Sequence, residues 1–124
     1  MNAITWMMLV AALLPLVAAI LSKAGGKDYD NNDPRPWLAR QRGWRARANA
    51  AQANLFEGLP FFYAAVLYAL HSRADSTHLG LLMLAWLVLR VAHLALYIGG
   101  RGTLRSLSWG LSLAVNIAIL FAAA

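Results

Sequence analysis

The hydrophobic positions of this chain fall into four long stretches that are separated by polar segments. They cover residues 3–21, 48–70, 79–98 and 104–124. Each stretch is close to the roughly 20 apolar residues that cross a bilayer as an α-helix. Charge inside them is rare: Glu57 lies in the second, Arg90 with His93 in the third, and Arg105 at the start of the fourth. The pattern predicts an all-α fold, an integral membrane four-helix bundle, with residues 1–124 forming a single membrane domain.

The composition supports this prediction and excludes several kinds of site. Of the 124 residues, 60% are hydrophobic and 13% are charged, whereas a soluble domain carries about 25% charged residues. The first stretch has Pro15 in its middle and no basic residue before it, which is typical of a retained span rather than a cleaved signal peptide. The chain has no cysteine, and its acidic loop lacks the glycine and glutamate of a calcium loop. We therefore predict no metal site.

The basic residues are distributed as a membrane topology would distribute them. Arg101 and Arg105 flank the last connection, and no lysine or arginine lies near either terminus. Seven others lie between the first two stretches: Lys23, Lys27, Arg35, Arg40, Arg42, Arg45 and Arg47. By the positive-inside rule, both basic connections are cytoplasmic and both termini lie on the non-cytoplasmic side. Topology thus explains the net charge of +6, and we expect no nucleic-acid partner.

Two of the spans carry polar residues on one face. On a helical wheel with Asn54 at 0°, Arg47 falls at about 20° and Glu57 at about −60°, whereas Gln52 falls at about 160°. In the third span, Arg90, His93 and Tyr97 share a face in the same way. An ionisable group inside a bilayer is costly, so each such position is a candidate functional site.

These residues allow two interpretations. Together with Arg105, the two polar faces can form one cluster in the cytoplasmic half of the bundle, whose surplus of cations suits an anionic ligand with more than one carboxylate. Alternatively, Glu57 pairs with Arg90 as a buried ion pair that joins two spans, and Asn54 forms an interhelical hydrogen bond. A small transporter is a further possibility, although no second intramembrane carboxylate is present for coupling.

The second span contains a motif with a family resemblance. Arg47, Ala51, Asn54, Glu57, Pro60 and Phe62 keep the spacing R-A-x-x-A-x-x-N-x-x-E-x-x-P-x-F. This pattern, in a four-span chain with a long basic first loop, resembles the MAPEG family, the membrane-associated proteins in eicosanoid and glutathione metabolism. The resemblance implies a homotrimer that binds glutathione between neighbouring subunits near the cytosolic face. Lipophilic small-molecule co-substrates would reach the site from the lipid bilayer.

The resemblance also implies roles for individual residues. Arg105 matches the arginine that stabilises the glutathione thiolate, and Ser106 matches the serine beside it in the prostaglandin E synthase branch, so these two are the candidate catalytic residues. Asn54 and Glu57 match residues that hold the amino and peptide groups of glutathione, and Gln52 matches a residue from the adjacent subunit. The full set of candidate glutathione-binding residues is Arg47, Gln52, Asn54, Glu57, Arg90, His93 and Tyr97.

Three positions depart from the pattern of the glutathione-using branches. Ala50 stands where those branches have an arginine, and Gly58 and His93 stand where they have tyrosines. In these features the chain is similar to the small bacterial members of the family, which implies a multi-pass protein of the bacterial inner (plasma) membrane. We expect a glutathione-dependent transferase or peroxidase that acts on lipophilic electrophiles; the alternative is a non-catalytic lipid- or hydrophobe-binding membrane trimer.

Overall fold

The computed structural model describes residues 2–124, which are helical except at the connections between helices. The helices are α1 (Asn2–Lys23), α2 (Pro34–Ala39), α3 (Trp44–Glu57), α4 (Leu59–His71), α5 (Ser76–Ile98) and α6 (Gly102–Leu120). Four segments are long and apolar enough to cross a membrane: Ala3–Lys23, Trp44–His71, Ser76–Ile98 and Gly102–Leu120. The prediction of an all-α chain with four membrane-spanning segments is thus confirmed, although the last helix ends at Leu120 rather than at residue 124.

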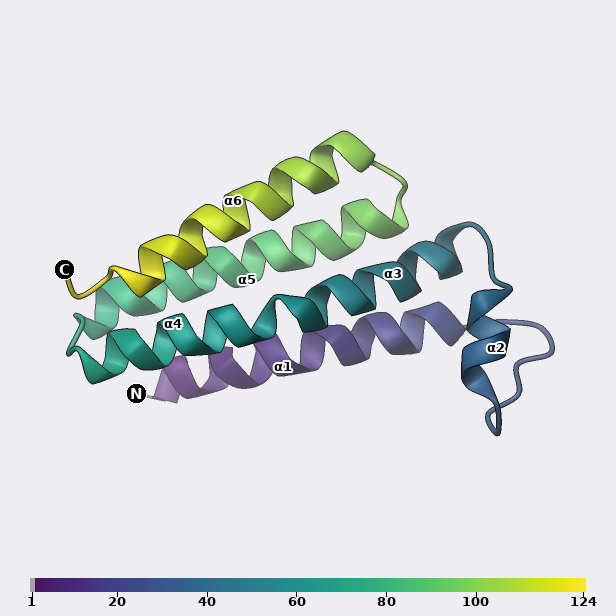
Figure 1. Ribbon diagram of the computed structural model, residues 1–124, viewed down its shortest axis with the longest axis horizontal. Helices are drawn as coiled ribbons and strands as arrows, with labels where there is room; N and C mark the ends of the chain where they lie inside the picture. Colours follow the sequence, from purple (N-terminus) through teal and green to yellow (C-terminus); the bar gives the residue numbers. More distant parts are fainter. Residues whose placement is uncertain (1) are drawn as a thin grey trace.

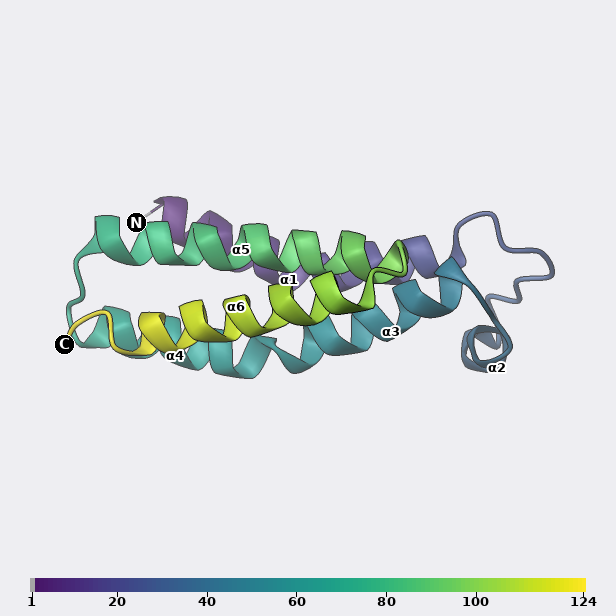
Figure 2. The ribbon, with the colours of Figure 1, turned by 90° about the horizontal axis from the view of Figure 1, so that it is seen from above.

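The four spans form an antiparallel bundle in which α5 is central. It packs against α1, α3 and α6, while α1 also packs against α3, and α4 also packs against α6. Figure 1 shows both chain termini at one end of the bundle, together with the turn between α4 and α5. The long first loop, α2 and the turn between α5 and α6 lie at the opposite end, as both Figure 1 and Figure 2 show. The basic connections therefore share one end, here called the loop end.

The second span is broken at Gly58. Helix α3 ends at Glu57, and α4 begins at Leu59. The Gly58 N–H still donates to the Asn54 carbonyl (3.1 Å), and the Phe62 N–H donates to the Gly58 carbonyl (3.3 Å). Pro60 lies in the first turn of α4, where a helix does not need the N–H that proline lacks. Two backbone hydrogen bonds thus continue across the break between α3 and α4.

A second set of contacts fixes the loop end. Gly100 has a φ of 73°, and the Arg101 N–H donates to the Leu96 carbonyl (2.9 Å), which closes α5 with a Schellman motif. The carbonyl of Ile98, left free at this helix end, accepts a hydrogen bond from Arg47 Nε (2.9 Å). Arg47 thus ties the start of α3 to the end of α5.

The core between α4 and α5 centres on two stacked aromatic rings. Phe62 is fully buried, and its ring centroid lies 3.8 Å from that of Trp86 with an interplanar angle of 14°. On the loop-end side of this pair, the Arg90 guanidinium carbon lies 5.6 Å from the Trp86 ring centroid. The apolar core therefore continues directly into the polar part of the bundle.

Truncating Phe62 should destabilise the bundle. Phe62→Ala removes a stacked ring from a closely packed site, and we expect it to lower the free energy of unfolding by about 3 kcal/mol. Phe61→Ala is the matched control, because Phe61 is 36% exposed at the neighbouring position. Thermal unfolding in detergent, followed by circular dichroism, measures both variants. Equal losses of stability in the two variants would contradict the packing described here.

Candidate functional site

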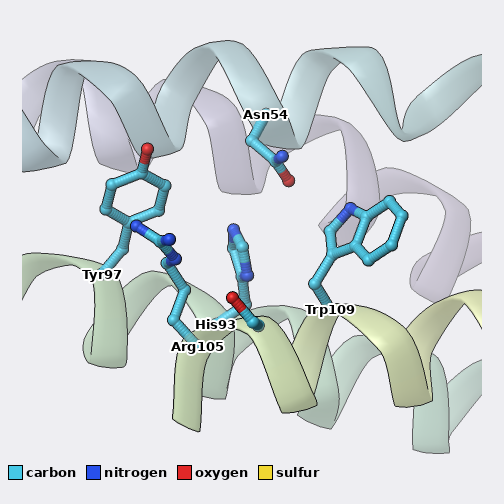
Figure 3. Close-up of a pocket in the computed structure, with 6 residues that line it drawn as sticks. Asn54, His93, Tyr97, Arg105 and Trp109 are labelled. Carbon is cyan, nitrogen blue, oxygen red and sulfur yellow. The ribbon is translucent and has the colours of Figure 1, made fainter. Parts of the chain in front are cut away.

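A cavity of ≈ 270 Å³ opens between α3, α5 and α6 towards the loop end. Its walls come from three helices, as Figure 3 shows. The lining residues are Asn54 from α3, His93 and Tyr97 from α5, and Arg105, Ser106 and Trp109 from α6. His93 and Tyr97 are four residues apart, as are Arg105 and Trp109, so each pair lies on one face of its helix. Helical spacing in the sequence thus brings these side chains together.

Arg105 is held in place by an aromatic ring. Its guanidinium carbon lies 4.5 Å from the centroid of the Tyr97 ring, a cation–π contact. The face of an aromatic ring restrains a guanidinium without occupying its N–H donors, and the lining of the cavity includes no carboxylate that would neutralise it. This end of the cavity is therefore cationic and can donate hydrogen bonds to an anion.

His93 forms the inner wall of the cavity. The residue is 2% exposed, its ring meets the Tyr97 ring edge-on with centroids 5.6 Å apart, and neither Nδ1 nor Nε2 has a hydrogen-bond partner within residues 2–124. Buried polar atoms in proteins are normally paired. A neutral imidazole has one donor and one acceptor, so His93 contributes a buried, unsatisfied polar ring to the wall of the cavity.

Arg90 lies behind the cavity and binds Asn54. The guanidinium is 2% exposed, and its Nη2 donates to both the backbone carbonyl and the Oδ1 of Asn54, each at 3.0 Å. A Cβ added to Gly58 would lie 3.2 Å from the same Nη2, so glycine at this position leaves room for the guanidinium. The departure at residue 58 therefore has a physical reason, which is the close approach of Arg90 to the break between α3 and α4.

Glu57 does not line the cavity, although the helical wheel placed it on the same face of the helix as Asn54. Its side chain is exposed and it is absent from the cavity lining. Arg90 donates to Asn54 instead, and within residues 2–124 the proposed Glu57–Arg90 ion pair does not form. The reason is geometric: Asn54 faces α5, so a residue about 60° further round the helix points out of the bundle.

Gln52 lies in a different groove of ≈ 390 Å³, as expected from its place on the opposite face of α3. This groove, here called the basic groove, is lined by Lys23, Pro34, Arg35, Leu38, Ala39, Asn49 and Gln52. It lies where the end of α1, α2 and α3 meet, and it also contains no carboxylate among its lining residues. Within a single chain, Gln52 is thus separated from Arg105.

Five of the nine residues proposed from the sequence line the cavity, and one more supports it. Asn54, His93, Tyr97, Arg105 and Ser106 are the lining residues, and Arg90 positions Asn54. Arg47, Gln52 and Glu57 lie elsewhere. Sequence reasoning missed Trp109, although its spacing of four residues from Arg105 placed it on the same face of α6.

The lining residues fit an anionic thiol such as glutathione. The Arg105 guanidinium and the unpaired His93 nitrogens are suited to carboxylate, amide and thiolate groups. The cavity also keeps a face that is partly open, because Ser106 and Trp109 are exposed. The cavity is therefore accessible from the side of Ser106 and Trp109.

Removing the Asn54 side chain should destabilise the protein even without a ligand. Asn54→Ala deletes Oδ1, one of the two acceptors of the buried Arg90 guanidinium, and a hydrogen bond to a charged group contributes about 1.5–3 kcal/mol. Asn49→Ala is the control, because Asn49 lies on the basic groove of the same helix. Denaturation in detergent without glutathione measures both. A stability loss in Asn49→Ala as large as that in Asn54→Ala would contradict this assignment.

Comparison with known proteins agrees with this arrangement. No curated protein and no solved structure matches the chain. The sequence model of the MAPEG family matches residues 3–124, which include all four membrane-spanning segments and the whole cavity. The match and the four apolar helices together identify an integral, multi-pass membrane protein. The chain belongs to the MAPEG family, whose members serve glutathione and eicosanoid metabolism.

Proposed function

We propose that this protein is a glutathione-dependent transferase or peroxidase that acts on lipophilic electrophiles, with Arg105 stabilising the thiolate. The observation that carries the proposal is the Arg105 guanidinium, held against Tyr97 in a cavity whose lining has no carboxylate. The imidazole of His93, whose nitrogens have no partner among the described residues, lines the same cavity (Figure 3) and supports the binding of a polar ligand.

One guanidinium is sufficient to stabilise the thiolate of bound glutathione at neutral pH. Favouring the thiolate over the thiol by a factor of about 100 needs about 2.7 kcal/mol of differential stabilisation. A unit charge at about 4 Å supplies about 4 kcal/mol at an effective dielectric constant of 20. Tyr97 fixes the guanidinium before the ligand arrives, so little of this energy is lost in reorganising the site.

The other lining residues then have distinct tasks. Glutathione supplies the nucleophilic sulfur when it is bound. Ser106, next to Arg105 at the exposed rim, donates its hydroxyl proton in a hydrogen bond to the sulfur or to an oxygen that gains charge. His93 orients the peptide with one donor and one acceptor, and the amide nitrogen of Asn54 remains a donor because Arg90 uses its oxygen atoms.

A homotrimer would join the two polar regions that one chain keeps apart. The basic groove with Lys23, Arg35 and Gln52 lies on the opposite side of α3 from Asn54. If the basic groove of one subunit covers the cavity of the next, each glutathione meets cations at both of its carboxylates. Glu57, exposed in the single chain, would then leave the lipid and accept a hydrogen bond from the glutathione amino group.

We also propose an orientation of the bundle in the membrane. The loop end, which carries the basic residues, faces the cytoplasm, and both termini lie on the other side of a bacterial inner membrane. The exposed rim of the cavity then opens towards the bilayer, from which lipophilic co-substrates enter.

A non-catalytic lipid-binding trimer is the second candidate, and one observation favours it. A groove of ≈ 500 Å³ lies between α1 and α5 near the termini. Its lining is mostly apolar and includes Ile4, Met7, Leu81 and Leu84. Such a groove accommodates a lipid chain and requires no contribution from Arg105.

Glutathione binding and its thiolate band test the proposed function directly. In purified wild-type protein, saturating glutathione should raise the melting temperature, since a ligand at 100 times its dissociation constant adds about 2.7 kcal/mol. It should also show the ultraviolet absorption of a thiolate at neutral pH. Arg105→Ala should lose the thiolate band, whereas the control Arg101→Ala should keep it, because Arg101 precedes α6 and lies outside the cavity lining. Absence of both signals in the wild type would favour the lipid-binding alternative.

The proposed homotrimer leads to a separate prediction. Native mass spectrometry from detergent should give the mass of three chains. Lys23→Glu should raise the glutathione dissociation constant about tenfold, because it reverses a charge that the basic groove brings to the neighbouring cavity. Lys27→Glu, outside that groove, should have little effect. A monomeric mass, or equal effects of the two substitutions, would contradict the shared site.

A further inference from the structure

The connection that enters α3 carries a run of arginines outside the two polar sites described above. Four arginines, at positions 40, 42, 45 and 47, fall within eight residues that contain no acidic side chain. Arg47 is hydrogen-bonded to the end of α5, whereas Arg40, Arg42 and Arg45 line neither the cavity nor the basic groove. Together with Trp44, these three arginines are here called the arginine patch. The patch has no task in the proposed function.

The arginine patch lies at the depth of the lipid headgroups. The second membrane-spanning segment, Trp44–His71, has 28 residues, which as a helix measure about 42 Å, whereas the hydrocarbon core of a bilayer is about 30 Å thick. The apolar stretch within this segment begins only at residue 48, so the extra length lies at the loop end. The first turn of α3 therefore stands in the headgroup layer, with the rest of the patch directly before it.

The two tryptophans of this connection have different environments. Trp37 is buried, its Nε1 donates to the Lys27 carbonyl (2.8 Å), and its ring meets that of Tyr29 edge-on. It therefore packs the first loop against α2. Trp44, by contrast, is exposed at the start of α3, and an exposed tryptophan at the boundary of a span is typical of the membrane interface. Trp44 is thus the aromatic residue of the patch that lipid can contact.

Arg45 is fixed in position and keeps donors free for a ligand. Its guanidinium carbon lies 4.5 Å from the centroid of the Trp44 ring, and its Nε donates to the Ala24 carbonyl (2.9 Å). A Cβ added to Gly25, whose φ is 65°, would lie 3.2 Å from Nη2, so the guanidinium rests close against the backbone that follows α1. The hydrogen bond uses Nε alone, and the two terminal nitrogens remain as donors for an anion.

We propose that the arginine patch binds the phosphate of an anionic phospholipid in the leaflet at the loop end. Guanidinium groups bind phosphate oxygens through paired hydrogen bonds, and basic residues beside the end of a span attract anionic lipid. Arg40 and Arg42 are exposed and add charge around the fixed Arg45, while Trp44 contacts the glycerol region. The inference goes beyond the proposed function and needs neither glutathione nor the cavity.

A lipid fits the patch better than a soluble anion does. The patch is an open surface at the membrane boundary, and a soluble phosphate that binds there loses its translational freedom for a few hydrogen bonds. A phospholipid is already confined to the leaflet beside the patch, so its effective concentration there is high. It also has an apolar part for Trp44, which a free phosphate lacks.

Lipid retention without glutathione measures the interaction. Purified protein in detergent is titrated with phosphatidylglycerol or with phosphatidylcholine of the same acyl chains, and native mass spectrometry counts the bound lipids. The wild type should bind phosphatidylglycerol more tightly. Arg40→Gln combined with Arg42→Gln should weaken that binding about 25-fold, about fivefold for each cation, and leave phosphatidylcholine unchanged. Equal binding of both lipids by the wild type, or unchanged phosphatidylglycerol binding in the double variant, would overturn the inference.

Three controls separate the patch from general charge, from folding and from soluble anions. Arg101→Gln removes a cation at the same end but outside the patch, and should change phosphatidylglycerol binding by less than about twofold. Arg40→Lys combined with Arg42→Lys should keep most of the preference, because the charge remains. Glycerol phosphate, the soluble headgroup, should leave the melting temperature unchanged at concentrations where phosphatidylglycerol raises it. A loss with Arg101→Gln as large as in the double variant, or equal stabilisation by glycerol phosphate, would contradict a lipid site at the patch.

Discussion

The arrangement of this bundle depends on how a buried guanidinium is satisfied. Arg90 lies inside a membrane-spanning segment and is 2% exposed, where an unpaired cation would be strongly destabilising. Two hydrogen bonds from Nη2 to Asn54, each of 3.0 Å, and the nearby face of Trp86 compensate it in part, while Nε has no hydrogen-bond partner among the described residues. One acceptor is a backbone carbonyl in the last turn of α3, so the pairing fixes the depth of α3 relative to α5. It also brings Nη2 to 3.2 Å from where a Cβ at position 58 would lie, so glycine fits at the break without a shift of the guanidinium.

The cavity follows from that alignment. His93 and Tyr97 continue the face of α5 on which Arg90 lies, so fixing Asn54 opposite Arg90 leaves the next two turns of α5 facing the space beside α3. The start of α6 then brings Arg105 over the Tyr97 ring. Arg47 supports the same alignment from the loop end, through its hydrogen bond to the Ile98 carbonyl. Structural hydrogen bonds thus use Arg90 and Arg47, whereas Arg105 lines the cavity.

Much of this was predictable from the sequence, and the exceptions have physical reasons. The lengths of the apolar stretches predicted the four spans, because a bilayer sets the length of a helix that crosses it. Helical periodicity placed His93 with Tyr97, and the family resemblance singled out Asn54 and Arg105. A helical wheel gives the angles between residues but not which neighbouring helix each one meets, so it could not show that Arg47 caps α5 or that Glu57 points outwards. Trp109 was overlooked although its spacing of four residues from Arg105 places it on the same face of α6.

The central claim is that Arg105 in this cavity holds the sulfur of glutathione. A structure of the assembled protein with glutathione sulfonate, in which an anionic sulfonate replaces the thiolate, tests it most directly. We predict density for the sulfonate within about 4 Å of the Arg105 guanidinium, the range in which opposite charges interact strongly, and density for a carboxylate in the basic groove of a neighbouring subunit. Density for the sulfonate away from Arg105, or an empty cavity at saturating ligand, would contradict the claim.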